Sequence, residues 1–363
     1  MKVGIITFHR AINYGAVLQT YALNYAIKEL GAKCNVIDYR CPKIEQDRKI
    51  IKKGLSIKEM FVLFLQSYIN IRKYKKFDKF IEKNISITNR KFYNKSDLLE
   101  LNKEYDEFIS GSDQVWSIIC TDFDKNYFLD FVEENNKKNS YAASFGFEKI
   151  PDEYANEYKH LLEKFNNISV REKQGIRIVE ELLNRSAEIS LDPTFLLNKT
   201  EWSKIAKEVS IKNKYVLLYL MEVNRDIIKF AENFAASKNY ELVYINSGGI
   251  RNRINAKYIR TAGPDEYLGL FKNAEYIITN SFHGVAFSIN FNKNFYVSLQ
   301  KAKNAANSRL DNILDILNLK DRLINLKEVE ISEKAINYEE VNNKIAENRE
   351  KSLNYLRNII TNK

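Results

Sequence analysis

Strand-like and helix-like segments alternate along most of this 363-residue chain, and this alternation limits the possible folds more than any other feature. It is typical of a parallel sheet flanked by helices, because parallel strands need a crossover between them. Two such series follow one another. The first runs from KVGIITF to LDPTFLL, and the second from KYVLLYL to NFYVSL. The sequence therefore predicts an α/β protein with two parallel sheets.

The length of the chain agrees with two domains, since a single hydrophobic core rarely serves more than about 250–300 residues. We place one Rossmann-like domain at residues 1–200, a second at residues 201–325 and a C-terminal helical segment at residues 326–363, with the join in the polar stretch 198–214. The last candidate helix, at 338–360, is long enough to pack back on the first domain.

Composition narrows the class of protein. Hydrophobic residues make up 45% of the chain, which fits a globular core. The formal net charge of +10 favours anionic ligands, but the basic residues are spread along the chain, so no nucleic-acid partner is predicted. Cys34, Cys41 and Cys120 match neither a zinc site nor a dense disulfide framework. With no run of roughly 18 apolar residues, we expect a cytoplasmic protein.

The segment Met60–Phe80 leaves two interpretations open. Its apolar start and basic continuation are compatible with a helix lying on an anionic membrane surface, which would place the protein at the inner face of a membrane. A helix packed against the core with a solvated basic face is the simpler interpretation, and we favour it.

In FHRAINYGAVLQ a strand gives way to a loop directly before a helix. Free backbone N–H groups at a helix start favour an anion or a sugar hydroxyl. His9, Asn13, Tyr14 and Gly15 are therefore candidates for binding an acceptor. The segment lacks the G-x-G-x-x-G pattern of dinucleotide sites. Asn13 as a helix cap and Gly15 as a close-packing residue explain the same spacing.

Three further strand ends in the first series carry polar side chains. SGSDQVW places Asp113 and Gln114 where they can meet a substrate, although Asp113 is equally suited to capping a helix. In SVREKQG a strand ends on Arg171, whose planar guanidinium matches carboxylate or phosphate; a salt bridge is the alternative. For Asp192, in LDPTFLL, we expect only a turn that leads out of the first domain.

TNSFHGVAFSIN places one of only three histidines at a strand, turn and helix junction. Such a junction lies at the carboxyl edge of a sheet, where open α/β folds bind ligands. Gly284 permits close approach to His283, and histidine can act as acid or base near neutral pH. We predict that His283 is catalytic rather than structural. His160, in a charged helical stretch, is expected to be exposed.

In this order and at these separations, NYGAVLQTYAL, SGSDQVW, SVREKQG, LDPTFLL and TNSFHGVAFSI resemble segments of the polysaccharide pyruvyltransferase family. The resemblance extends from Lys2 to about Arg322. It implies two Rossmann-like halves arranged as in GT-B glycosyltransferases, with the active cleft between them. It also implies transfer of the enolpyruvyl unit of phosphoenolpyruvate onto a sugar of a cell-surface polysaccharide or its precursor, forming a pyruvate ketal. Phosphoenolpyruvate is then a co-substrate, and no redox cofactor or obligatory metal is needed.

The resemblance carries over unevenly to individual residues. Arg171 matches an arginine used on the anionic donor, and His283 matches the family histidine of the second domain. Many characterised members read Arg-Leu-His where this chain reads Ser281, Phe282, His283, so one arginine is missing. Either Arg309 or Lys301 supplies that charge, or the donor differs.

The predicted site thus has three parts. The catalytic candidates are His283 and Asp113. The donor-binding candidates are Arg171, Ser281, Gly284, Lys301 and Arg309. The acceptor-binding candidates are His9, Asn13, Tyr14, Gly15 and Gln114, for a nucleotide-linked or lipid-linked sugar.

Two other functions remain open. One is a GT-B glycosyltransferase that uses a nucleotide sugar, since GPDEYLGLFKNAEYIITNS also resembles a donor domain. The other is a non-catalytic protein that binds a glycan precursor, which the missing arginine favours and the retained Arg171 and His283 oppose. The sequence indicates neither the acceptor sugar nor the oligomeric state.

Overall fold

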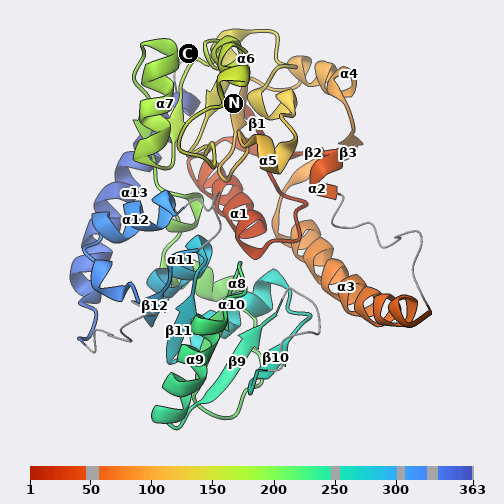
Figure 1. The fold of residues 1–363 in the computed structure, drawn as a ribbon. Helices are drawn as coiled ribbons and strands as arrows, with labels where there is room; N and C mark the ends of the chain where they lie inside the picture. Colours follow the sequence, from red (N-terminus) through yellow and green to blue (C-terminus); the bar gives the residue numbers. More distant parts are fainter. Residues whose placement is uncertain (46–56, 247–253, 301–306, 325–333, 362–363) are drawn as a thin grey trace.

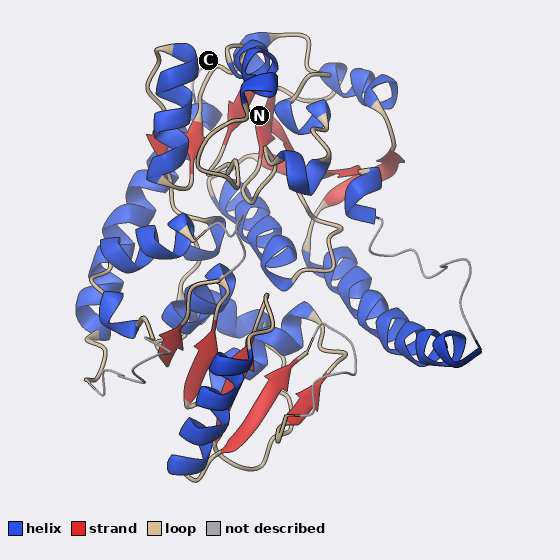
Figure 2. Ribbon diagram, in the orientation of Figure 1, coloured by secondary structure: helices blue, strands red, loops and turns tan. Residues whose placement is uncertain are grey.

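The computed structural model describes residues 1–45, 57–246, 254–300, 307–324 and 334–361. It contains two five-stranded parallel sheets with helices packed around each, one in each half of the chain (Figures 1 and 2). Consecutive residues of a strand, such as Ile5 and Ile6, belong to different hydrophobic cores on the two faces of the sheet. Such strands are buried on both faces, which explains their nearly continuous apolar sequences.

The first sheet has the strand order β3-β2-β1-β4-β5. Its strands are β1 (Lys2–Ile6), β2 (Lys33–Tyr39), β3 (Ile87–Phe92), β4 (Glu107–Ser110) and β5 (Lys138–Ser140). Isolated bridges continue it from β5 to β6 (Ser169–Val170), which pairs with β7 (Glu188–Ile189). The helices of this half are α1 (Tyr14–Glu29), α2 (Pro42–Glu45), α3 (Ile57–Asn84), α4 (Lys95–Leu98), α5 (Ile118–Thr121), α6 (Ala155–Leu162) and α7 (Lys173–Leu183).

The second sheet repeats the same order, β10-β9-β8-β11-β12. Its strands are β8 (Tyr215–Tyr219), β9 (Glu241–Ile245), β10 (Lys257–Ile259), β11 (Tyr276–Thr279) and β12 (Asn294–Val297). The helices are α8 (Lys199–Ile205), α9 (Arg225–Ser237), α10 (Pro264–Asn273) and α11 (Phe282–Asn290). In each sheet the strand order reverses beside the first strand, β1 or β8, and ligands bind at such switch points in open α/β folds.

The C-terminal helices are α12 (Ser308–Ile316) and α13 (Tyr338–Thr361), and α13 returns from the second half to the first (Figure 1). The Tyr355 hydroxyl donates to the Ser140 carbonyl at 2.8 Å, and Arg349 Nε donates to the Phe195 carbonyl at 2.6 Å. The expectation of two Rossmann-like halves in a GT-B-like arrangement, with the chain end packed back on the first, is confirmed.

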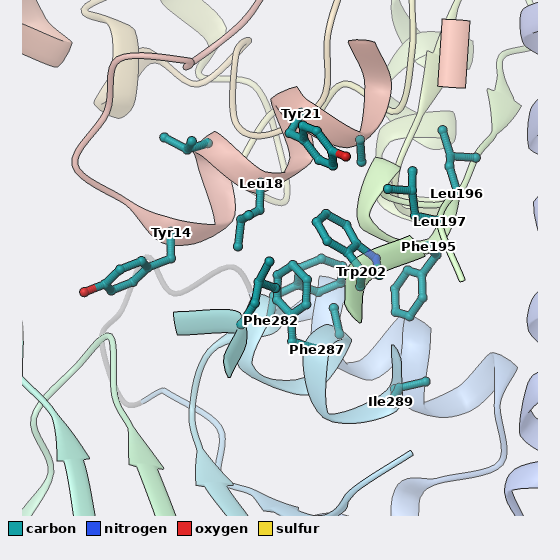
Figure 3. Close-up of a cluster of buried hydrophobic side chains, with 14 of the residues drawn as sticks. Tyr14, Leu18, Tyr21, Phe195, Leu196, Leu197, Trp202, Phe282, Phe287 and Ile289 are labelled. Carbon is teal, nitrogen blue, oxygen red and sulfur yellow. The ribbon is translucent and has the colours of Figure 1, made fainter. Parts of the chain in front are cut away.

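One apolar core runs through both halves of the molecule. Leu18 on α1 points toward Phe282 and Phe287 on α11 (Figure 3). Tyr14 of α1 stacks on Tyr267 of α10, with 4.5 Å between ring centroids. The two halves are therefore joined by close hydrophobic packing.

The C-terminal part of α3 packs against this core, because Phe77, Phe80 and Ile81 are all buried. This agrees with the simpler interpretation for the C-terminal part of the segment Met60–Phe80, whereas the side chains of its apolar start lie outside those described. Within the part of the chain that the structure describes, no helix combines the length and apolar character required to cross a membrane.

Candidate active site

The start of α1, after β1, and the start of α11, after β11, meet between the two sheets (Figure 1). At this point Gly15 lies against the ring of His283. A Cβ atom added to Gly15 would lie 1.9 Å from His283 Nδ1, so only glycine fits against this ring. Two motifs separated by most of the chain thus meet across the domain junction.

Asp192 organises the polar side chains next to His283. Its Oδ2 accepts hydrogen bonds from Arg171 Nη1 at 2.6 Å and Ser112 Oγ at 3.2 Å, and lies 3.7 Å from His283 Nε2. Its Oδ1 accepts from the backbone and hydroxyl of Thr194. Burial alone would raise the pKa of Asp192, but His283 and the charge of Arg171 hold it well below its usual range. The carboxylate is therefore charged and immobile.

The expectation that Asp192 only turns the chain is corrected by this geometry. The residue does cap the short 3-10 helix that follows, as a turn residue would. However, it also joins the arginine of the first half to the histidine of the second. The sequence did contain an indication of this contact, because Asp192 and Arg171 each follow a strand and such residues gather at one edge of a sheet.

Arg171 is buried. It forms the salt bridge that the sequence offered as one interpretation, and it keeps nitrogens for the anion that the other interpretation requires. Nη1 forms the salt bridge to Asp192, whereas Nε and Nη2 have no hydrogen-bond partner among the described residues. Nη2 lies 3.7 Å from Asp113 Oδ1, and the guanidinium lies over the Phe282 ring, 5.0 Å from its centroid. Burial acts to lower the pKa of Arg171, but the charges of Asp192, Asp113 and Glu172 raise it overall.

Arg309 of α12 approaches the same ring and the same carboxylate. Its guanidinium lies 5.9 Å from the Phe282 centroid, and Nη1 lies 3.9 Å from Asp113 Oδ1. Burial, followed by the like charge of Arg171, lowers the pKa of Arg309. Two guanidinium groups close enough to repel each other favour an additional anion between or beside them.

Asp113 has a backbone φ of 76°, which is unusual for a residue other than glycine. Its Oδ1 accepts a hydrogen bond from the backbone N–H of Gln114 at 2.9 Å, so the side chain stabilises this turn locally. The conformation directs a carboxylate toward Arg171 and Arg309 at 3.7 and 3.9 Å. Strained backbone of this kind is common at functional sites.

Two predicted donor-binding residues, Ser281 and Gly284, form the start of α11. Ser281 is the N-cap of α11 and accepts a hydrogen bond from the Gly284 N–H at 3.3 Å. Gly284 provides close packing, since a Cβ there would lie 2.3 Å from Thr279 Oγ1. Lys301 lies outside the described residues. Of the two cations considered as substitutes for the missing arginine, the structure therefore places Arg309 at the site.

The predicted acceptor-binding residues do not form one open surface. His9 is 1% exposed, and its ring nitrogens lie 2.9 Å from Asp38 Oδ1 and 3.2 Å from the Thr7 carbonyl. Tyr14 is 1% exposed and donates its hydroxyl proton to the Ala262 carbonyl. Asn13 caps α1, as the alternative interpretation held. The structure thus offers neither His9 nor Tyr14 to an acceptor.

Gln114 remains partly accessible next to Asp113. Its Oε1 lies 3.7 Å from the Cys120 sulfur, and its amide packs against Gly146. His160 is exposed, as expected. Within the described ranges, no group of three or more His, Cys, Asp or Glu side chains is arranged to hold a metal ion.

Two parallel α/β halves with a polar site at their junction define a two-domain protein of the GT-B-like class. Comparison with protein families identifies it further. The polysaccharide pyruvyl transferase family model matches residues 13–298, and the chain belongs to this family. No curated protein matches the sequence.

Several solved structures are similar over almost the whole chain. UDP-GlcNAc 2-epimerase from Methanocaldococcus jannaschii has 12% identity and a TM-score of 0.49, covering 95% of this chain and 99% of the other. The epimerase from Neisseria meningitidis has 10% identity and a TM-score of 0.46, covering 98% and 94%. The Streptomyces sp. SF2575 glycosyltransferase SsfS6 has 8% identity and a TM-score of 0.44, covering 99% and 100%. These similarities are too distant to indicate an activity.

Proposed function

We propose that this chain transfers the enolpyruvyl unit of phosphoenolpyruvate to a sugar of a cell-surface polysaccharide or its precursor, forming a pyruvate ketal. The observation that carries the proposal is the buried pair of His283 and Asp192, placed beside Arg171 and Arg309 where the two halves meet. Membership of the polysaccharide pyruvyl transferase family supports the same reaction.

Phosphoenolpyruvate carries a carboxylate and a phosphate, and guanidinium groups bind both with charge-assisted hydrogen bonds. Arg171 has two nitrogens without hydrogen-bond partners among the described residues. Arg309 lies close enough to Arg171 for its pKa to be lowered, so a bound anion would relieve their repulsion. Asp113 lies 3.7 Å from Arg171 and 3.9 Å from Arg309, so its carboxylate forms no hydrogen bond with Nη2 of Arg171, and this nitrogen can donate to a ligand.

The reaction then needs three proton transfers. In the first step the oxygen of a sugar hydroxyl bonds to C2 of the enolpyruvyl unit, its proton passes to a base, and C3 receives a proton to become a methyl group. In the second step another hydroxyl oxygen bonds to C2 and the bond from C2 to the phosphate oxygen breaks. The proton of this second hydroxyl passes to the departing phosphate, and inorganic phosphate leaves. No oxidant or reductant is required.

His283 is the proposed acid or base because Nε2 is buried and has no hydrogen-bond partner among the described residues. The charged Asp192 carboxylate, 3.7 Å away, stabilises the imidazolium that forms when the ring accepts a proton. Asp113 is the second proposed proton carrier, since its carboxylate faces the same two arginines.

The test is phosphate release from phosphoenolpyruvate in the presence of a panel of nucleotide-linked and lipid-linked sugars. We expect release that depends on one acceptor and is matched by formation of its pyruvate ketal, detected by mass spectrometry. Thermal stabilisation by a nucleotide sugar, with no phosphate release, would instead indicate a glycosyltransferase. Binding of a glycan precursor with no turnover of either donor would indicate a non-catalytic protein.

A further inference from the structure

A pocket of about 140 Å³ adjoins the candidate active site on the side of α12 and α13. Arg171, Asp192 and Phe282 form its inner wall, and Arg309, Asn312 and Lys351 contribute from the two C-terminal helices. All three residues from α12 and α13 lie beyond the region matched by the family model. The match to the family therefore does not cover this part of the wall.

The charge balance of the pocket favours an anion. Among its described lining residues three are cationic and one, Asp192, is a carboxylate, which already accepts hydrogen bonds from Arg171, Ser112 and Thr194. Lys351 is exposed and forms no ion pair with any side chain in the described ranges. Its ammonium group is thus available at the pocket, while Nε and Nη2 of Arg171 have no hydrogen-bond partner among the described residues, although carboxylates lie within 4 Å of both.

The pocket wall is also fixed in position. The Leu191 N–H donates to Ser352 Oγ at 3.0 Å, and the Ser352 hydroxyl donates to the Asn348 carbonyl at 2.9 Å. These bonds attach the turn of α13 that carries Lys351 to the loop that carries Asp192. The helix backbone fixed in this way presents Lys351 from a defined position on the pocket wall.

We propose that this pocket is the phosphate subsite for the donor, with Lys351 and Asn312 as specificity-determining residues and Arg309 as the inner cation. The assignment rests on the proposed function. A lysine ammonium is a compact charge suited to phosphate, whereas the planar guanidinium of Arg171 suits the carboxylate at the other end of the donor. The apolar lining from α12, at Ile313 and Ile316, faces the space next to these cations and suits the uncharged carbon skeleton.

Calorimetry on the full chain tests the subsite with phosphoenolpyruvate, inorganic phosphate, pyruvate and glucose as separate probes. We expect Lys351→Ala to weaken binding of phosphoenolpyruvate and phosphate about tenfold, the loss typical of one charged hydrogen bond. Pyruvate, which lacks the phosphate, should bind equally to both proteins, and Lys351→Arg should restore most of the affinity. Lys344→Ala is the matched control, because Lys344 lies on the same helix and pairs with Glu340 at 3.0 Å.

The results of these experiments test the phosphate subsite and the proposed reaction independently. If Lys351→Ala loses phosphate affinity but no ketal forms with any acceptor, the subsite stands and the proposed function fails. If ketal forms and the variant binds phosphate and phosphoenolpyruvate as the wild type does, the subsite is refuted and the function stands. Failure of the wild type to bind either anion, or binding of glucose alone, also refutes the subsite. An unchanged melting temperature in Lys351→Ala shows that the loss is not one of folding.

Discussion

Two buried histidine and aspartate pairs occupy related places in this molecule, and they differ in how completely they are satisfied. His9 follows β1 and lies 2.9 Å from Asp38, which also accepts hydrogen bonds from Arg10 at 2.7 and 3.0 Å. His283 follows β11 and lies 3.7 Å from Asp192. Both His9 nitrogens have partners, whereas His283 Nε2 has none among the described residues.

The two histidines share residue type, burial and a strand-end position, so none of these properties separates them. What separates them is a ring nitrogen of His283 that has no hydrogen-bond partner among the described residues. Asp38 accepts hydrogen bonds from His9 and Arg10, and this network stabilises the fold without involving a ligand. Asp192 lines the pocket and His283 lies 3.7 Å from its carboxylate, and for this reason we propose that this pair, and not His9 and Asp38, exchanges a proton with a ligand.

The largest expected difference between the two pairs is in catalysis. His283→Ala should lower turnover by about 10²–10⁴-fold, the usual contribution of a positioned acid or base. His9→Ala should lower the melting temperature and leave turnover per folded molecule unchanged, because the ring is sealed in the first half. Phosphate release, normalised to the folded fraction from circular dichroism, measures both. Full activity in a destabilised His283→Ala protein would make both histidines structural.

The second largest expected effect is the loss of stability when Asp38 is replaced. Asp38→Asn removes the charge that faces Arg10 and His9, and breaking a buried ion pair costs about 3–5 kcal/mol of unfolding free energy. Urea denaturation measures this loss. Asp315→Asn is the control, since Asp315 pairs with Lys320 at the surface and its replacement should change stability little. Equal losses in the two variants would contradict a special role for the buried network.

A smaller effect is expected from Gly15→Ala. The new Cβ would overlap the His283 ring, so the ring or α1 must move, and overpacking of this kind costs about 1–3 kcal/mol. Turnover should fall together with stability because the displaced ring is the proposed proton carrier. Gly4→Ala is the control: its nearest contacts lie at 3.3 Å and are far from His283, so turnover should be retained. Retained turnover in Gly15→Ala would show that the position of His283 does not matter.

The smallest effect is a pH dependence of stability. Burial lowers the pKa of His9, and its hydrogen bond with Asp38 offsets this only in part. Below the unfolded pKa of about 6.5 the unfolded chain therefore binds more protons at this site than the folded chain. The free energy of unfolding should fall as pH decreases from about 6.5 toward the folded pKa.

Urea denaturation at intervals between pH 5 and 8 measures this slope. His9→Gln should flatten it, while replacement of the exposed His160 provides the control. Asp38 acts at lower pH: burial would raise its pKa, but hydrogen bonds from His9 and Arg10 hold it well below the usual range. The contribution of the Asp38 charge to the free energy of unfolding is present above about pH 4 and is lost as pH falls further. A His9→Gln protein with the wild-type slope would exclude His9 as the source.

Local patterns were sufficient to predict most of the fold. The apolar strands that form the centres of both sheets are evident as short hydrophobic runs, and the glycine that ends α1, Gly31, has the positive φ of 91° that such a position favours. The edge strand β3 (Ile87–Phe92) was not predicted, because its sequence ITNRKF is polar and largely accessible. An edge strand forms through pairing with its neighbour rather than through burial of both faces.

The site was less predictable because its members are brought together from distant parts of the chain. Asp192 gains its role from Ser112, 80 residues away, and from His283 in the other half. Conversely, Tyr14 belongs to a motif that predicted acceptor binding, but its ring packs between the two halves of the molecule. Sequence patterns identify which side chains lie at a sheet edge, whereas their partners depend on how the two sheets meet.

The shared apolar core has a consequence for motion and for folding. Domains joined by a large hydrophobic interface do not hinge freely, so substrates should enter between walls whose spacing changes little. Separating the halves would expose Leu18 and Tyr14 on one side and Phe282 and Phe287 on the other. Neither half should then be stable as an isolated fragment, and thermal denaturation of the whole chain should proceed as one cooperative transition seen equally by fluorescence from Trp116 and Trp202.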